Sequence, residues 1–154
     1  MMGTVADRLT ELGLTVPEVA APVATYVPAL VDGDLVYVSG QLPVIAGELV
    51  ATGKVGAEVS TDAAAALART CAVNCVAALA SVVDLERVRQ IVKVTGFVAS
   101  APGFTDQPLV VNGASELFGA VFGPAGQHAR SAVGVAELPK GAPVEIDVIA
   151  RIAL

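Results

Sequence analysis

Apolar residues recur along this chain with two different periods, one helical and one typical of strands. Between Ser60 and Val83 they recur every three or four positions, and Ser60 can cap the first turn, so we expect a long helix there. The same spacing predicts a second helix from Leu109 to Phe122, which Gly123 ends. Each of these helices is long enough to cover part of a sheet.

Alternation of apolar and polar residues predicts the sheet itself. The expected strands are Tyr26–Val31, Leu35–Ser39, Val88–Val98, Arg130–Glu137 and Val144–Ile152. The Asp32-Gly33-Asp34 step between the first two is typical of a hairpin turn. This order predicts a single α+β domain, residues 26–154, in which a mixed sheet carries both helices on one face. A short helix and an extended arm, residues 1–25, precede it.

The last two strands are expected to pair as a hairpin. Five of their residues should then face the helices: Val133, Val135, Val144, Ile146 and Val148. The opposite face should carry small and charged residues: Arg130, Ala132, Gly134, Ala136, Glu145, Asp147 and Arg151. In that register Arg130 and Glu145 of one chain lie about 16 Å apart. A small ligand could therefore contact both only where two subunits meet.

Composition supports an oligomer. Hydrophobic residues make up 55% of the chain and charged residues only 16%, so part of the surface should be covered by other subunits. The net charge of −6 and the lack of a basic cluster disfavour nucleic acids and anionic membranes as partners. The most hydrophobic stretch contains Arg69 and Asn74, so we expect no membrane span. We also expect no signal peptide and a cytoplasmic location.

Five polar side chains are candidates for chemistry. The guanidinium of Arg130 matches the shape of a carboxylate, and Glu145 could orient a water molecule or act as an acid or base. The hydroxyl groups of Tyr26 and Ser39 and the amide of Asn112 could bind polar ligand atoms. Each also has an ordinary structural interpretation, as an ion-pair partner, a hydrogen-bonding group or a helix cap. The residues alone predict only an oligomeric domain with an anion-binding cleft between subunits.

No cofactor or metal site is expected. Cys71 and Cys75 lie on one face of the first long helix, and the single histidine, His128, is distant in sequence. Two thiols and one imidazole are too few for a metal centre, so buried free thiols are the simpler interpretation. His128 also lacks a third partner for a catalytic triad.

Three segments resemble the RidA family, also called YjgF. They are LVYVSGQ at residues 35–41, HARSAV at residues 128–133 and ELPKGAPVEI at residues 137–146. The resemblance runs from about Tyr26 to the C-terminus, and the last two segments are its most specific part. It implies a chorismate-mutase-like fold and a homotrimer with three clefts between subunits.

The resemblance also implies roles for individual residues. Arg130 matches the arginine that binds the substrate carboxylate, Glu145 the acid that positions water, and Tyr26 the family tyrosine. The pocket-lining and substrate-binding positions correspond to Ser39, Gly40, Asn112 and Ala132, the last standing where many members have cysteine.

The function that the resemblance implies is hydrolysis of reactive 2-imino acids, or their enamine tautomers, to 2-keto acids and ammonia. No metal or cofactor would take part. The alternative is a non-catalytic trimer that binds a small carboxylate and responds to metabolites or acts as a chaperone. Hydrolysis of another carbonyl-type substrate also stays open. The ribonuclease activity sometimes ascribed to this family is disfavoured by the net charge of −6.

Overall fold

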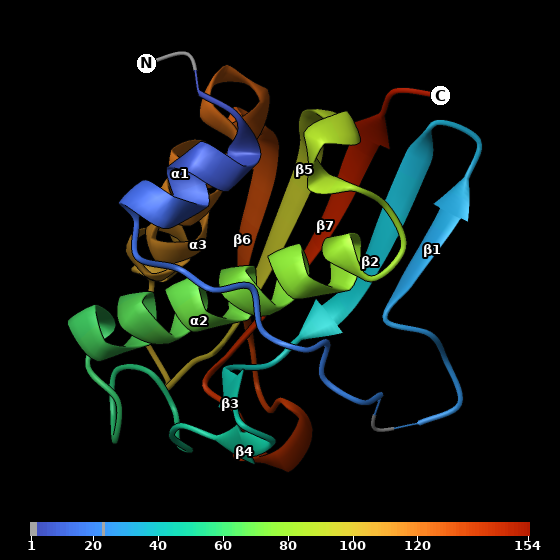
Figure 1. Ribbon diagram of the computed structural model, residues 1–154. Helices are drawn as coiled ribbons and strands as arrows, with labels where there is room; N and C mark the ends of the chain where they lie inside the picture. Colours follow the sequence, from blue (N-terminus) through green and yellow to red (C-terminus); the bar gives the residue numbers. More distant parts are fainter. Residues whose placement is uncertain (1–2, 23) are drawn as a thin grey trace.

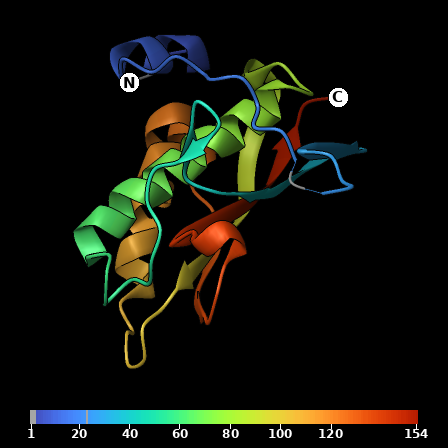
Figure 2. The ribbon, with the colours of Figure 1, turned by 90° about the horizontal axis from the view of Figure 1, so that it is seen from below.

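Two helices cover one face of a five-stranded sheet in the computed structural model, which describes residues 3–22 and 24–154 (Figures 1 and 2). The α-helices are α1 (Val5–Glu11), α2 (Thr61–Ala80) and α3 (Gln107–Phe122). The strands are β1 (Ala29–Asp32), β2 (Leu35–Gln41), β3 (Val44–Ile45), β4 (Glu48–Leu49), β5 (Val88–Ala99), β6 (Ala129–Val135) and β7 (Val144–Ile152). Short 3-10 helices lie between these elements at Leu85–Arg87, Gly123–Gly126 and Pro139–Gly141.

The sheet is mixed, as the sequence predicts. Its strand order is β1-β2-β7-β5-β6, and β3 and β4 form a separate small ribbon. β5 and β6 are parallel, whereas the β1–β2, β2–β7 and β7–β5 pairs are antiparallel. Parallel neighbours need a crossover connection, and α3 supplies it between β5 and β6. The predicted α+β fold with both long helices on one face is therefore confirmed.

The predicted pairing of the last two strands is wrong. β5 lies between β6 and β7 and bonds to both, so the two final strands do not form a hairpin. Alternation within a strand fixes which residues share a face but carries no information about which strand is the neighbour. The chain between Val135 and Val144 crosses the end of β5 instead of turning back beside β6.

The sequence predicts correctly which side chains of β7 face the helices, but for β6 it assigns the two faces the wrong way round. Val144, Ile146 and Val148 are buried under the helices. Arg130 pairs with the fully buried Val94 of β5, so Arg130, and with it Ala132 and Gly134, lies on the helix-covered face. Val133, predicted to be buried, lies on the open face and is 42% exposed.

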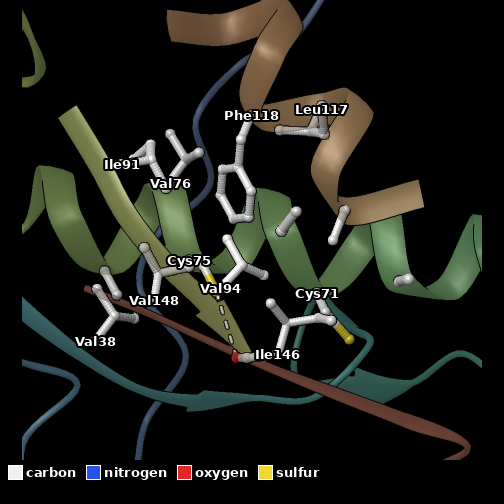
Figure 3. Packing of buried hydrophobic residues seen from close by; sticks show 14 of the residues in the cluster. Val38, Cys71, Cys75, Val76, Ile91, Val94, Leu117, Phe118, Ile146 and Val148 are labelled. Atoms are coloured by element: carbon white, nitrogen blue, oxygen red, sulfur yellow. Dashed lines mark hydrogen bonds between the residues drawn. The ribbon is translucent and has the colours of Figure 1, made fainter. Parts of the chain in front are cut away.

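The core lies between the sheet and the two long helices (Figure 3). Phe118 of α3 is fully buried and lies between the two helices above Val94. The thiols of Cys71 and Cys75 donate to the carbonyl oxygens of Val144 and Ile146 in β7, at 3.7 Å and 3.4 Å. α2 therefore packs directly on the central strand. It is long and apolar enough to cross a membrane, but most of that stretch is buried inside this domain, as in the core helix of a soluble protein.

The N-terminal segment packs on the outer side of the helices (Figure 1). Thr4 caps α1 with a complete capping box. The Thr4 hydroxyl oxygen accepts from the Asp7 backbone N–H, and the Asp7 carboxylate accepts from the Thr4 backbone N–H. Beyond α1 the arm runs along α2, where Leu14 and Val16 pack against the core. β1 begins only at Ala29, three residues after the predicted start.

The face of the sheet opposite the helices carries exposed apolar side chains. Leu30 of β1 is 58% exposed, and Tyr37 of β2 and Val133 of β6 are each 42% exposed. Tyr37 lies between the buried Val36 and Val38 and pairs with Leu30, so both side chains project away from the core. A face of this composition is typical of a surface that another chain covers.

Candidate active site

Arg130 is held against α3 by three hydrogen bonds. Its Nη1 donates to the Asn112 Oδ1 at 2.8 Å and to the Ser115 Oγ at 3.2 Å. Its Nη2 donates to the carbonyl oxygen of Pro108 at 3.3 Å. Positions 108, 112 and 115 recur at helical spacing, so one stripe of α3 presents all three acceptors to the second residue of β6.

These acceptors leave the charge of Arg130 uncompensated. An amide oxygen, a hydroxyl and a backbone carbonyl are all neutral, and no carboxylate of the described residues forms an ion pair with this guanidinium. A guanidinium has five N–H donors. Three are used, which leaves the Nε–H and one Nη2–H for a ligand. The side chain is half-buried, so those donors can reach a carboxylate that approaches from outside.

Glu145 is the centre of a second group of predicted residues, on the opposite face of the sheet. It pairs with Phe97 of β5, and its carboxylate lies over Gly40 of β2. A Cβ on Gly40 would collide with that carboxylate, so the close approach requires glycine at this position. The β2–β7 register shifts between Val38 and Gln41, which places Gly40 in the irregular part of the pairing. Such bulges often redirect side chains beside active sites.

Tyr26 and Ser39 belong to the same region as Glu145. Tyr26 precedes β1 and lines a cavity together with Gly40 and Glu145. The Ser39 Oγ donates to the carbonyl oxygen of Val27 at 2.6 Å. This bond ties the segment that carries Tyr26 to the end of β2. Ser39 thus positions a neighbouring segment, and its oxygen keeps lone pairs that can accept a hydrogen bond from a ligand, so the predicted contact stays a prediction.

The cavity beside Glu145 has a volume of about 1040 Å³. Apolar residues of the N-terminal arm, of the segment from the end of β2 through β3, and of α2 form much of its wall: Leu14, Pro17, Val19, Ala20, Leu42, Val44, Ile45 and Val73. Asn74, itself buried, donates from Nδ2 to the carbonyl oxygens of Leu42 and Val44 and so holds that segment on α2. The volume is at the upper end of the range typical of small-molecule sites.

Burial changes the acidity of the carboxylates on the open face. The pKa of Glu145 is raised, first by desolvation and then by the negative charge of Asp147. Desolvation also raises the pKa of Asp147, against which a hydrogen bond from Thr95 and the charge of Lys93 act. A carboxyl group with a raised pKa exchanges protons more readily near neutral pH, which suits an acid or base.

The structure separates the predicted residues into two groups. Arg130 pairs with Val94 of β5, and Glu145 pairs with Phe97, three residues further along the same strand. The Cα atoms of Arg130 and Glu145 are therefore about 10 Å apart along the strand direction. They are also two strand spacings apart across the sheet, which is again about 10 Å. They also project from opposite faces. Arg130, Asn112 and Ala132 form one group, and Tyr26, Ser39, Gly40 and Glu145 the other. Within one chain a small ligand cannot contact both Arg130 and Glu145, although the reason differs from the predicted hairpin register.

Within residues 3–22 and 24–154, no cluster of three or more His, Cys, Asp or Glu side chains could hold a metal ion. Burial raises the pKa of the Cys71 and Cys75 thiols well above its usual value. Both are thus neutral thiols at physiological pH, without the thiolate character that a metal ligand or nucleophile needs.

The model of the family described as "YjgF/chorismate mutase-like, putative endoribonuclease" matches residues 6–148. The chain belongs to this family. It is 45% identical over 152 residues to protein TCP17 of Trypanosoma cruzi, which covers 97% of this chain and 95% of that protein. The RidA (YjgF) resemblance found in the sequence is therefore confirmed.

Solved structures agree with this assignment. The crystal structure of protein Atu1372 from Agrobacterium tumefaciens, whose function is unknown, is 46% identical, with a TM-score of 0.89 over 98% of this chain and 93% of that one. The structure of E. coli TdcF with bound serine is 27% identical, with a TM-score of 0.64 over 88% of this chain and 94% of that one.

Sequence reasoning missed Ser115 and the Pro108 carbonyl, and it gave His128 no role. The Nε2 of His128 lies 2.9 Å from the Ser115 Oγ, and its Nδ1 lies 2.6 Å from the carbonyl oxygen of Gly126. The i, i+3 spacing of Asn112 and Ser115 was a usable signal, since both side chains lie on one helix face. The contact with His128 had no such signal, because it depends on how α3 docks beside β6.

Proposed function

We propose that this protein hydrolyses 2-imino acids, or their enamine tautomers, to 2-keto acids and ammonia. It would act as a homotrimer, with Arg130 of one subunit and Glu145 of the next meeting in each cleft. The observation that carries the proposal is the guanidinium of Arg130, which three neutral acceptors orient and which no carboxylate in the described part of the chain neutralises. Such a group is suited to bind a ligand carboxylate by two parallel hydrogen bonds.

The partly apolar open face supports an assembly of several chains. Glu145 projects from that face, so a second chain packed on it would bring its own residues to this carboxylate. Arg130 lies on the edge strand β6, so a neighbouring chain that packs along this edge can bring its Glu145 toward a ligand bound to the guanidinium. A trimer that buries the face would also remove Leu30, Tyr37 and Val133 from water, which favours association.

Glu145 would supply the proton transfers. In its ionised form it accepts a proton from water as the water oxygen bonds to the imine carbon and the π electrons move to nitrogen. It then returns that proton to the nitrogen, which leaves a hydroxyl and an amino group on one carbon. Glu145 next takes the hydroxyl proton and passes it to the amino nitrogen as the C–N bond breaks, so that ammonia leaves and the C=O bond of the 2-keto acid forms. The raised pKa of Glu145 brings it nearer to neutrality, where these steps are feasible. Arg130 would hold the substrate carboxylate and orient the carbon toward the water.

The cavity beside Glu145 would receive the side chain of the substrate. Its wall is largely apolar, and its volume of about 1040 Å³ exceeds what a methyl group occupies. We therefore expect imino acids with larger apolar side chains to be better substrates than 2-iminopropionate. The E. coli TdcF structure, which holds serine, supports an amino-acid-sized carboxylate as the ligand class of this fold.

The test is the rate of ammonia release from freshly generated 2-imino acids. Arg130→Ala is expected to lower kcat/KM by at least about 30-fold, because loss of a charge-assisted partner costs about 2–5 kcal/mol. Arg151→Ala is the matched control, since Arg151 is an exposed arginine paired with Asp34 at 3.4 Å. An equal rate in wild type and Arg130→Ala would exclude this mechanism.

The same assay separates the alternative, a trimer that binds a small carboxylate without catalysis. That alternative predicts that a 2-keto acid binds to the wild type and not to Arg130→Ala, while neither releases ammonia above the spontaneous rate. Cleavage of RNA by the purified protein, abolished in Glu145→Gln, would instead support the activity in the family description.

A further inference from the structure

We propose that His128 is a positioning residue for Arg130 and acts through the hydroxyl group of Ser115. The inference rests on the proposed function for its kinetic consequence, because Arg130 is the carboxylate anchor there. The positioning role itself is inferred from three successive contacts. They link the Gly126 carbonyl to His128, His128 to Ser115, and Ser115 to the Arg130 guanidinium.

The first contact fixes the tautomer of His128. A carbonyl oxygen only accepts hydrogen bonds, so the Nδ1, 2.6 Å from the Gly126 oxygen, must carry the proton. In the neutral ring the Nε2 is then an acceptor. Phe118 meets the imidazole edge to face, with ring centroids 6.1 Å apart, and limits rotation of the ring. Both the orientation and the protonated nitrogen of the neutral ring are thus determined by its surroundings.

The second contact orients the hydroxyl group of Ser115. The Nε2 of His128 lies 2.9 Å from the Oγ, and in the neutral ring with its proton on Nδ1 this nitrogen accepts, so the serine hydroxyl donates to it. With its proton directed toward the ring, the Oγ presents its lone pairs elsewhere. The Nη1 of Arg130 donates to this oxygen at 3.2 Å. Without His128 the hydroxyl group could rotate, and its proton could turn toward the guanidinium.

The third contact restricts the guanidinium. Asn112 and Ser115 together take both protons of Nη1, and Pro108 takes one of Nη2. A planar group held at three points cannot turn about its long side chain. The Nε–H and the remaining Nη2–H are consequently held in place before a ligand arrives. Preorganisation of this kind lowers the entropy that binding would otherwise cost.

Three single variants and one double variant test the coupling. Ser115→Ala and His128→Ala should each raise the KM for a 2-imino acid, or the Kd for the 2-keto acid, by about tenfold, the effect of losing one hydrogen bond of this type. The change in kcat should stay below about twofold, since Glu145 is untouched. His128→Gln should restore most of the affinity, because the glutamine amide oxygen can accept from Ser115.

The double variant distinguishes a chain of contacts from two independent ones. If His128 acts only through Ser115, the Ser115→Ala/His128→Ala protein binds no more weakly than Ser115→Ala alone. Additive losses would overturn the proposal. Ser81→Ala is the control for removal of a hydroxyl group, because Ser81 caps the end of α2 and its Oγ bonds to the nearby Ala78 carbonyl at 2.7 Å, so affinity should be unchanged.

A ligand-free measurement keeps this test separate from the proposed function. The Nε–H of Arg130 gives an amide-like NMR signal, which Arg130→Lys identifies by its loss. Its order parameter should be high in the wild type, low in Ser115→Ala and His128→Ala, and recovered in His128→Gln. An unchanged order parameter would overturn the positioning role even if the enzyme is active. Ordered Arg130 without imine hydrolysis would instead contradict the proposed function alone.

Discussion

The Arg130 group and the Glu145 group are built in different ways. Arg130 is held by regular secondary structure: one stripe of α3 and the start of β6 determine where the guanidinium lies. Glu145 extends from a regular strand, but its surroundings are irregular, because the bulge at Gly40 and the arm before β1 form them. The first group is complete within one chain. The second opens into a cavity that Arg69 and Lys140 also line, and Arg130 of the same chain is not part of its wall.

This difference indicates that two neighbouring subunits contribute different parts of one site. A rigid anchor can bind the same carboxylate group in every substrate, and an irregular wall of loops can differ in shape without disturbing the sheet. Because the two groups project from opposite faces, the proposed reaction needs one group from each of two chains. The predictions below test this dependence.

The largest expected effect is recovery of activity when two inactive variants are mixed. Arg130→Ala lacks the anchor and Glu145→Gln lacks the base, so each alone should lose most activity. After joint unfolding and refolding in equal amounts, about a quarter of the clefts combine an intact Arg130 with an intact Glu145. Ammonia release should therefore recover to about a quarter of the wild-type rate.

The control is a mixture in which Arg130→Ala is refolded with the double variant Arg130→Ala/Glu145→Gln, since no intact cleft can form there. Absence of recovery in the first mixture, with mixed oligomers verified by mass spectrometry, would mean that each chain works alone.

A smaller effect is expected from Gly40→Ala. The added methyl group would collide with the Glu145 carboxylate and displace it, which should lower kcat by about tenfold or more. The matched control is Gly119→Ala, at an exposed helix position where a Cβ meets nothing within 4 Å. That substitution should raise the free energy of unfolding slightly, because alanine is the better helix former. Equal activity in Gly40→Ala and wild type would show that the close approach has no catalytic role.

The smallest effect is on the pH dependence of stability. The pKa values of Glu145 and Asp147 are raised in the folded protein, so the folded state binds more protons than the unfolded state above about pH 4. These two carboxyl groups should therefore stabilise the folded protein most at pH values below their pKa in the unfolded chain. This stabilisation should decrease as the pH rises through their higher pKa in the folded protein. Glu145→Gln/Asp147→Asn should remove this decline, measured by denaturant titration from pH 4 to 7 at one protein concentration.

Glu58→Gln tests the opposite sign. Hydrogen bonds to backbone N–H groups, first that of Lys54, lower the pKa of the exposed Glu58 carboxyl. The ionised Glu58 carboxylate therefore stabilises the folded protein at pH values above its pKa in the unfolded chain. This stabilisation is lost as the pH falls through its lower pKa in the folded protein. Replacing Glu58 should therefore flatten the profile at the acidic end, whereas the Glu145 and Asp147 changes act at higher pH. Identical profiles for both variants would contradict the assigned causes.

Much of the candidate site could be predicted from the sequence. Seven residues were assigned to a site that two subunits share, and the structure places them in two groups that one ligand cannot bridge within a chain. The family segments around Ser39, Arg130 and Glu145 carried that prediction. Ser115 and His128 could not be predicted as partners of Arg130, because nothing in a linear pattern says which helix face docks beside which strand.

The sequence by itself determined the α-helices, the five strands of the main sheet and the residues that share a face within each of these strands, because these depend on local periodicity and on capping at residues such as Thr4 and Ser60. It did not predict the small ribbon of β3 and β4. Only the tertiary structure decided that β5 separates β6 from β7 and that Arg130 faces α3. Strand neighbours are selected by the burial and hydrogen bonding of the whole sheet at once. No local stretch of the chain contains that information.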